Sequence, residues 1–148
     1  MVEAYTRTPH VVRRRVLRAT TPGYRVGVLG VLRRPDGRVL LVDQPYVVGW
    51  SLPGGDLTWG ESVQQGLQRE LREELGLDLS VPAPVTAHQR TADRWVTFAV
   101  LLDVNDEQAD RARAGSPELR AIGWFDLAEL PEMDPDAAAP MALVLAGS

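Results

Sequence analysis

A single amphipathic helix with crowded carboxylates restricts the fold of this chain more than any other segment. Between Ser62 and Leu75 an apolar residue recurs at every fourth position, which predicts a helix that packs one face on a core. Ser62 can cap its first turn, Gln65 stands at the reciprocal position of a capping box, and Gly76 supplies a left-handed stop. The apolar stripe consists of Val63, Leu67, Leu71 and Leu75. The rest of the fold must therefore offer a hydrophobic surface to this helix.

Three glutamates lie beside this stripe. At about 100° per residue, Glu73 and Glu74 fall about 60° to one side and 40° to the other side of Glu70, so the three share one face. That face lies roughly 80–90° from the apolar stripe, which puts it at the rim of the core, where water is partly excluded. Like charges at this spacing repel each other. A divalent cation would compensate them, and sites rich in oxygen suit Mg²⁺ or Mn²⁺.

Two further residues of the helix bear on this site. Arg69 lies four residues before Glu73, an order that adds little to helix stability, so we expect Arg69 to orient a carboxylate. Gly66 lies in mid-helix, where glycine costs about 1 kcal/mol relative to alanine. Either a small residue there lets backbone or ligand approach the acidic side closely, or the position merely tolerates glycine, often for a packing reason.

Strand segments surround the helix. Strands are predicted at 24–32, 38–43, 77–90, 94–104 and 120–126, and a short element is predicted at 11–17. The sequence Pro35-Asp36-Gly37 predicts a tight turn between the first two strands. A loop is predicted at 105–115, a helical turn at 126–130 and a short helix from about residue 136. Many strands around a few helices indicate a mixed α+β domain.

Composition excludes several classes of protein and shows one charge asymmetry. The chain has 148 residues, a net charge of −4 and no cysteine, which excludes disulfides and thiolate metal sites. No segment resembles a signal peptide or a membrane span, so a cytoplasmic protein without membrane contact is expected. The first 25 residues hold six arginines against one acidic residue. This basic arm is interpreted as solvated or as pairing with an acidic partner surface, and nucleic-acid binding through it is the alternative.

The stretch from Gly55 to Leu77 resembles the Nudix box, the signature of a hydrolase family. The positions that the box specifies are filled by Gly55, Glu61, Arg69, Glu70, Leu71, Glu73, Glu74, Gly76 and Leu77. Outside the box, "WSLPGG" at 50–55 and "WFDLAELPE" at 124–132 also look like this family. The similarity spans 24–132 and leaves the basic arm uncovered.

The resemblance implies a fold and a chemistry. The fold would be an α/β/α sandwich around a mixed sheet, in one domain over 1–148 with an arm at 1–23, a core at 24–131 and a helical tail at 132–148. Family members use Mg²⁺ or Mn²⁺ to hydrolyse a nucleoside diphosphate linked to another group, by attack of water on phosphorus. A (d)NTP or a nucleotide sugar is the expected substrate. Removal of pyrophosphate from RNA 5′ ends and nucleotide sensing without turnover are the alternatives. Relatives are often dimers, so a homodimer is expected.

The resemblance also implies roles for single residues. The implied metal ligands are the Gly55 carbonyl, Glu61, Glu70, Glu73 and Glu74. The implied catalytic residues are Glu70, Glu73, Arg69 and Glu118. Of these, one glutamate would act as the base, Arg69 would hold a glutamate in place, and Glu118 would add a carboxylate from outside the box. Substrate contacts are expected from two aromatic rings and three arginines: Trp59, Tyr46, Arg25, Arg90 and Arg94. Trp95 is interpreted as a packing residue.

Overall fold

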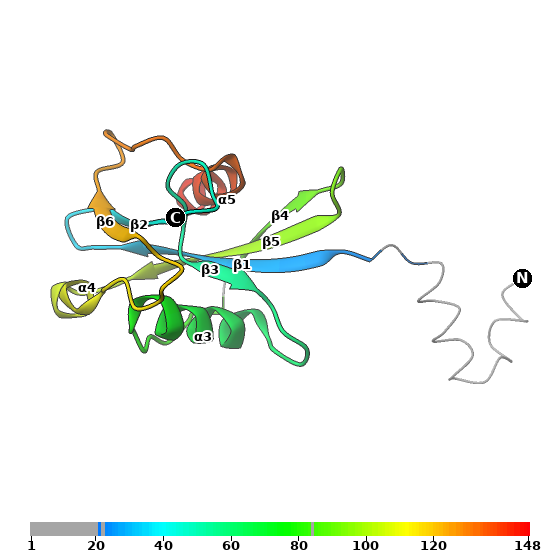
Figure 1. Cartoon of the computed structure of the whole chain (residues 1–148), viewed down its shortest axis with the longest axis horizontal. Coiled ribbons are helices and arrows are strands. Elements are labelled where there is room, and N and C mark those ends of the chain that lie inside the picture. Colours follow the sequence, from blue (N-terminus) through cyan, green and yellow to red (C-terminus); the bar gives the residue numbers. More distant parts are fainter. Residues whose placement is uncertain (1–20, 22, 84) are drawn as a thin grey trace, which may run out of the picture.

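A mixed six-stranded sheet organises the residues described by this computed structural model, which are 21, 23–83 and 85–148 (Figure 1). The strands are β1 (Arg25–Arg33), β2 (Val39–Asp43), β3 (Gly54–Asp56), β4 (Thr86–Arg90), β5 (Trp95–Asp103) and β6 (Ala121–Phe125). Five of them follow the order β4-β5-β1-β2-β6, and β3 pairs with β1 off this path. β1 and β5 run parallel, whereas the other pairs are antiparallel. The expected mixed sheet is confirmed.

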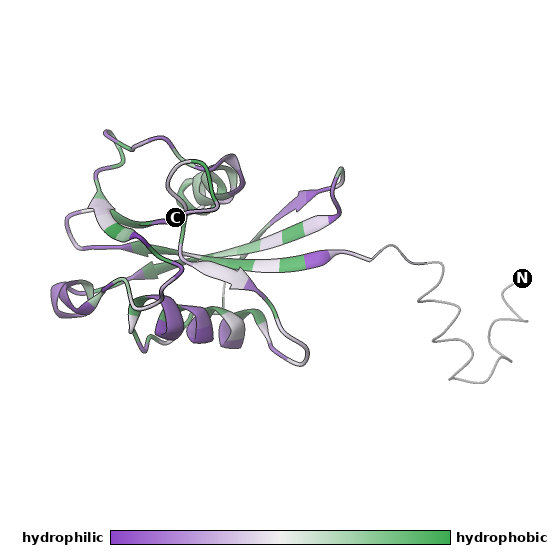
Figure 2. Ribbon diagram, viewed as in Figure 1, coloured by the Kyte–Doolittle hydropathy of each residue, from purple (hydrophilic) through white to green (hydrophobic). Residues whose placement is uncertain are grey.

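Helices cover both faces of the sheet. The helices α3 (Val63–Leu75) and α4 (Asp106–Arg111) lie on one face, and α5 (Pro135–Ala146) lies on the other (Figure 1). Figure 2 shows that the side of α3 turned away from the sheet is hydrophilic, as the spacing of its apolar residues predicts. The α/β/α sandwich is therefore confirmed.

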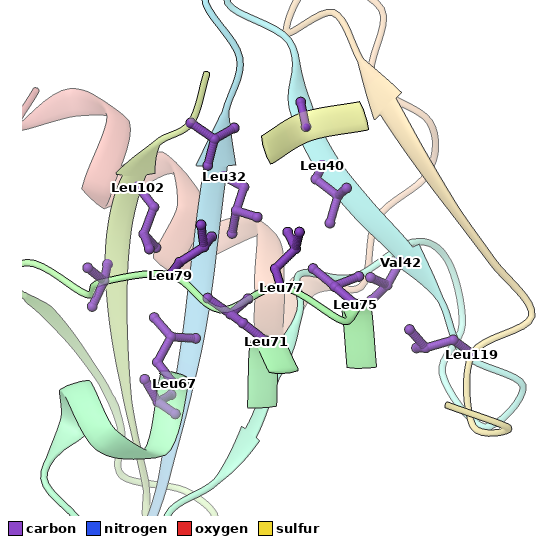
Figure 3. Close-up of a cluster of buried hydrophobic side chains, with 14 residues drawn as sticks. Leu32, Leu40, Val42, Leu67, Leu71, Leu75, Leu77, Leu79, Leu102 and Leu119 are labelled. Atoms are coloured by element: carbon purple, nitrogen blue, oxygen red, sulfur yellow. The ribbon is translucent and has the colours of Figure 1, made fainter. Parts of the chain in front are cut away.

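Two hydrophobic cores fill the space between these layers. Leu67, Leu71 and Leu75 of α3 are fully buried against the sheet (Figure 3). On the opposite face, α5 packs through Ala137, Met141 and Val144. Because successive strand residues point to opposite faces, β1 supplies Val28 to the first core and Val31 to the second. Each fully buried side chain of this size contributes about 1.5–3 kcal/mol, so the sheet holds α3 firmly.

The helix predicted to begin at Ser62 is confirmed, including both of its ends. The Gln65 N–H donates to Ser62 Oγ at 3.1 Å, and the Ser62 N–H donates to Gln65 Oε1 at 3.0 Å. Gly76 ends the helix with a φ of 68°. At Gly66 a Cβ would lie 2.1 Å from Cδ2 of Leu57, so a larger residue there would displace the Leu57 side chain.

The loop predicted after β5 is wrong, because part of that segment is helix α4. Asn105 caps the helix: the Gln108 N–H donates to Asn105 Oδ1 at 2.8 Å, and the Asn105 N–H donates to Gln108 Oε1 at 3.0 Å. Arg34 bonds to Asp106 at 3.1 Å and to Asp110 at 3.2 Å, which fastens α4 to the end of β1. A capping box and these ion pairs therefore form a short helix without an apolar stripe.

The strand predicted at 77–90 is present only in its last part, which is β4 at the edge of the sheet. Pro82 lacks the N–H that a strand ladder requires. Before it, Leu77 and Leu79 are buried in the core beside α3 instead of pairing with a strand. The apolar residues at the start of this segment therefore belong to a loop that fills the core, and only its end is a strand.

A turn follows β6, as the sequence predicts. The turn predicted at 126–130 is present, closed by the Glu129 N–H on the Asp126 carbonyl at 3.0 Å. Among the described residues, none of the helices has both the length and the apolar character that a membrane crossing requires. The element predicted at 11–17 lies outside the described residues, as does nearly all of the arm at 1–23. The single-domain assignment over 1–148 stays a prediction.

Candidate active site

The acidic face of α3 meets β3 where two glycines bring backbone and carboxylate together. Gly54 has a φ of 149°, and a Cβ there would lie 2.0 Å from the Val28 carbonyl oxygen. At Gly55 a Cβ would lie 2.5 Å from Oε1 of Glu70. Gly54 has no room for a side chain because the clash is with backbone, whereas a side chain at Gly55 would force the Glu70 carboxylate to move.

Arg69 is the cation around which the acidic side chains are arranged. Its guanidinium group donates to Glu61 at 2.6 and 3.1 Å, to Glu70 at 2.8 Å and more weakly to Glu73 at 3.4 Å. It also donates to the Asp56 carbonyl oxygen at 3.1 Å, which ties α3 to the end of β3. Arg69 therefore compensates only part of the repulsion expected from the sequence, because it contacts Glu70 and Glu73 but not Glu74.

Glu74 takes no part in the Arg69 network. It is 6% exposed, and its Oε2 accepts one hydrogen bond, from the Gly54 N–H at 3.0 Å. Burial raises the pKa of Glu74 to about 8, and the nearby charges of Glu70 and Glu118 add to this rise. At neutral pH this carboxyl group therefore keeps its proton unless a cation is supplied.

The three glutamates of the acidic face are not equivalent. The Glu70 side chain is 13% exposed and that of Glu73 is 58% exposed, whereas Glu74 is buried. Only Glu70 occupies the partly buried rim where the sequence predicted all three. Burial raises the pKa of Glu70, while hydrogen bonds from Arg69 lower the pKa of Glu61 to about 2. Glu61 therefore stays ionised near neutral pH, whereas burial disfavours the charged forms of Glu70 and Glu74.

The chemistry of this donor set suits a hard divalent cation. Carboxylate and carbonyl oxygens are the ligands that Mg²⁺ and Mn²⁺ prefer, and the buried Glu74 makes no ion pair with Arg69. Within the part of the chain that the structure describes, no three acidic or histidine side chains enclose a common point. Arg69 instead pairs with oxygens of Glu61, Glu70 and Glu73. The types of ligand atom suit such an ion, and Arg69 competes with it for the carboxylate oxygens.

A cleft of about 590 Å³ opens beside these groups. At the acidic end it is lined by Glu70, Glu74 and Glu118 together with the two glycines of β3. From there it extends over the first residues of β1 and β5 to Trp95. The carboxylates therefore face a space large enough for a small organic ligand rather than bulk solvent alone.

The structure brings some of the predicted substrate contacts to this cleft and leaves others outside. Those that line it are Tyr46, Arg25, Arg90 and the predicted carboxylate Glu118. Trp59 is 99% exposed and is not among the lining residues. Arg94, with a φ of 54° in the turn between β4 and β5, also lies outside the lining. The roles of all six stay predictions, and those of Trp59 and Arg94 have no support from the cleft.

Trp95 lines the cleft although the sequence interpretation assigned it to packing. The guanidinium carbon of Arg25 lies 4.2 Å from the centre of its ring, and that of Arg90 lies 5.5 Å away. Arg25 and Trp95 are neighbours only through the parallel register of β1 and β5, which are far apart in the sequence. No local pattern signals such a register, so the sequence could not place Trp95 at the site.

The raised pKa of Glu74 predicts a pH-dependent stability of the metal-free protein. The stabilising effect of the buried, protonated carboxyl is complete below its ordinary pKa of 4.5 and is lost as the pH rises through about 8. In the presence of a chelator, the unfolding free energy should therefore fall over this window, and Glu74→Gln should flatten the fall. Urea unfolding at several pH values measures it. Parallel curves for the two proteins would show that Glu74 titrates normally.

Comparison with known proteins agrees with the sequence motif and the fold. The model of the NUDIX domain matches residues 23–145. A MutT-like protein of Streptomyces ambofaciens is 31% identical over 115 residues, which are 77% of this chain and 72% of the relative. The CTP pyrophosphohydrolase of Escherichia coli is 38% identical over 69 residues, 44% of this chain and 51% of that relative, so the chain spans about half of its length. The crystal structure of a MutT NUDIX hydrolase from Burkholderia pseudomallei has a TM-score of 0.67 at 29% identity, covering 83% of this chain and 99% of that one. The chain belongs to the NUDIX family of hydrolases.

Proposed function

We propose that this protein hydrolyses the diphosphate linkage of a small nucleotide, either a nucleoside triphosphate or a nucleotide sugar, by attack of water on phosphorus. NUDIX hydrolases generally use divalent metal ions, and Mg²⁺ or Mn²⁺ is the proposed cofactor. One observation carries the proposal: Glu70 and the buried Glu74 line the cleft beside Gly54 and Gly55. A pyrophosphate placed there would meet carboxyl groups that can share a cation with it.

The groups that would hold the ion are Glu61, Glu70, Glu73, Glu74 and the Gly55 carbonyl. A bound divalent cation supplies positive charge against the phosphate oxygens and lowers the pKa of a water ligand. The protein supplies the oxygens and their orientation. Arg69 fixes Glu61 and Glu70 through the hydrogen bonds described above, and the Gly54 N–H fixes Glu74.

A carboxylate that accepts the proton of the attacking water must lie within reach of the cleft. Glu118 lines the cleft from the segment before β6, and its charge is close enough to raise the pKa of both Glu74 and Tyr46. We assign this role to Glu118, with Glu70 and Glu73 as the alternatives. Glu118 comes from outside the motif, so its side chain remains available when the acidic face of α3 is engaged.

The names of the relatives support nucleotides as the substrate class without singling out one. The Escherichia coli relative acts on CTP, and two others are named as an 8-oxo-dGDP phosphatase and an RNA pyrophosphohydrolase. What these substrates share is a nucleoside attached to a chain of phosphates. The proposed substrate of this chain is therefore a nucleoside attached to a chain of phosphates, and a free nucleotide is preferred over an RNA end.

A release assay tests the proposed function. We expect phosphate or pyrophosphate release from at least one member of a panel of nucleoside triphosphates and nucleotide sugars, abolished by a chelator and restored by Mg²⁺ or Mn²⁺. A capped or triphosphorylated RNA in the same panel tests the RNA alternative, whose binding should weaken steeply as salt rises. If nucleotides bind but neither phosphate nor pyrophosphate is released under any condition, the protein is a nucleotide sensor and not a hydrolase.

A further inference from the structure

Three side chains form a row across neighbouring strands at the end of the cleft away from the carboxylates. Trp95 of β5 pairs in register with Arg25 of β1 on one side and with Arg90 of β4 on the other. Residues in register on adjacent strands point to the same face of a sheet. The guanidinium carbons lie 4.2 and 5.5 Å from the indole centre, so an aromatic ring and two cations lie next to one another on this surface.

The indole of Trp95 leans from this row toward the candidate active site. A Cβ at Gly27 would lie 3.0 Å from the indole Nε1 and 3.7 Å from the Gly55 carbonyl oxygen. Only Gly27 of β1, which has no side chain, therefore lies between the ring and the Gly55 carbonyl oxygen, the proposed metal ligand. A ligand with its phosphates at Gly55 would bring an attached group onto the ring.

The charges around the ring favour a neutral group. Arg25 is bonded to Asp56 at 2.6 Å, and Arg90 is paired with Asp136 at the first turn of α5. Asp134 also lines the cleft, within range of the charge of Arg90. Both cations thus already have carboxylate partners, so a further phosphate placed here would meet excess negative charge. A planar, uncharged ring with polar edges fits these surroundings better than a second anion does.

We propose that the surface at Trp95 binds the nucleobase of the substrate. The inference rests on the proposed function and defines its substrate class: a nucleotide whose base lies on the Trp95 surface while its diphosphate lies at Gly55. Aromatic rings and guanidinium planes are the groups on which bases stack in proteins. Trp59, the ring that the sequence favoured for this role, is 99% exposed and outside the cleft.

The experiment compares Trp95→Ala with Trp59→Ala, using the nucleotide that wild type turns over best. Loss of one stacking contact should raise KM about 5- to 150-fold, with kcat changed by less than about threefold. The inhibition constant of methylenediphosphonate, which has no base, should stay within about twofold, because its binding needs only the acidic end. Trp59→Ala tests the rival ring, and Leu143→Ala, at an exposed residue of α5 outside the cleft lining, should leave all three constants unchanged.

Two milder variants keep the test decisive where Trp95→Ala fails to fold. Trp95→Phe retains a ring and should keep KM within about fivefold of wild type. Gly27→Ala retains the indole but shifts it slightly, because the new Cβ would lie 3.0 Å from Nε1, so it should raise KM by less than Trp95→Ala does without raising the inhibition constant of methylenediphosphonate.

The outcomes separate this inference from the proposed function. Absence of turnover by wild type on the whole panel would overturn the proposed function and the base site with it. Turnover by wild type with an unchanged KM in Trp95→Ala would overturn the base site alone. An equal loss for the nucleotide and for methylenediphosphonate would make Trp95 a structural residue, and a base-dependent loss in Trp59→Ala would move the base to that ring.

Discussion

Glu74→Gln is expected to lower turnover by about 10²- to 10⁴-fold while the protein stays folded. Glutamine has nearly the shape of glutamic acid but cannot ionise, so the buried site loses an anionic oxygen. The fold should persist, because the pKa of Glu74, raised to about 8 by burial, already favours the neutral form near neutral pH. The measurements are kcat at saturating Mg²⁺ and the melting temperature.

Glu73→Gln tests whether an exposed glutamate of the motif is needed for turnover as the buried Glu74 is. The Glu73 side chain is 58% exposed, so its replacement should leave stability unchanged and still reduce turnover by about 10²-fold or more. Glu129→Gln is the matched control, since Glu129 is an exposed acid in the turn after β6 and should retain wild-type turnover. Full activity in both Glu73→Gln and Glu74→Gln would remove the acidic face of α3 from the mechanism.

Local features of α3 could be predicted because they depend on neighbours in the sequence. The capping box of Ser62, the stripe that includes Leu71, and the left-handed Gly76 each need only residues within about four positions. The same holds for the tight turn between β1 and β2, where Gly37 has a φ of 89°. Short-range hydrogen bonding and side-chain periodicity were therefore sufficient for the element that carries the acidic residues.

Features that depend on long-range register could not be predicted. The helical spacing placed Glu73 and Glu74 on one face. It could not show that Gly54 of β3 would cover Glu74 and leave Glu73 in solvent. The row at Trp95 needs the parallel pairing of β1 with β5. The helix α4 was missed for a different reason, since its Asn105 capping box was present in the sequence but had no apolar periodicity to draw attention to it.

Arg69→Ala is expected to lower both stability and turnover. The Glu70 side chain is only 13% exposed beside Arg69, and without the guanidinium group it loses its cation, so removing this partner of a partly buried pair should be destabilising. We expect the melting temperature of the metal-free protein to fall by roughly 5–10 °C. Turnover should fall by about 10²-fold, because Glu61 and Glu70 lose the group that orients them. Thermal melts with a chelator and assays with Mg²⁺ measure the two effects.

Arg72→Ala provides the control on the same helix. Arg72 is 60% exposed and bonds to Asp78, which is 75% exposed, so its loss should shift the melting temperature by less than about 2 °C. Because Arg69 and a divalent cation compete for the same oxygens, Mg²⁺ should raise the melting temperature of Arg69→Ala by more than that of wild type. If Arg69→Ala melts like Arg72→Ala and gains nothing from Mg²⁺, then the carboxylates of α3 tolerate one another without any cation, and the physical reason for a metal site on this helix is lost.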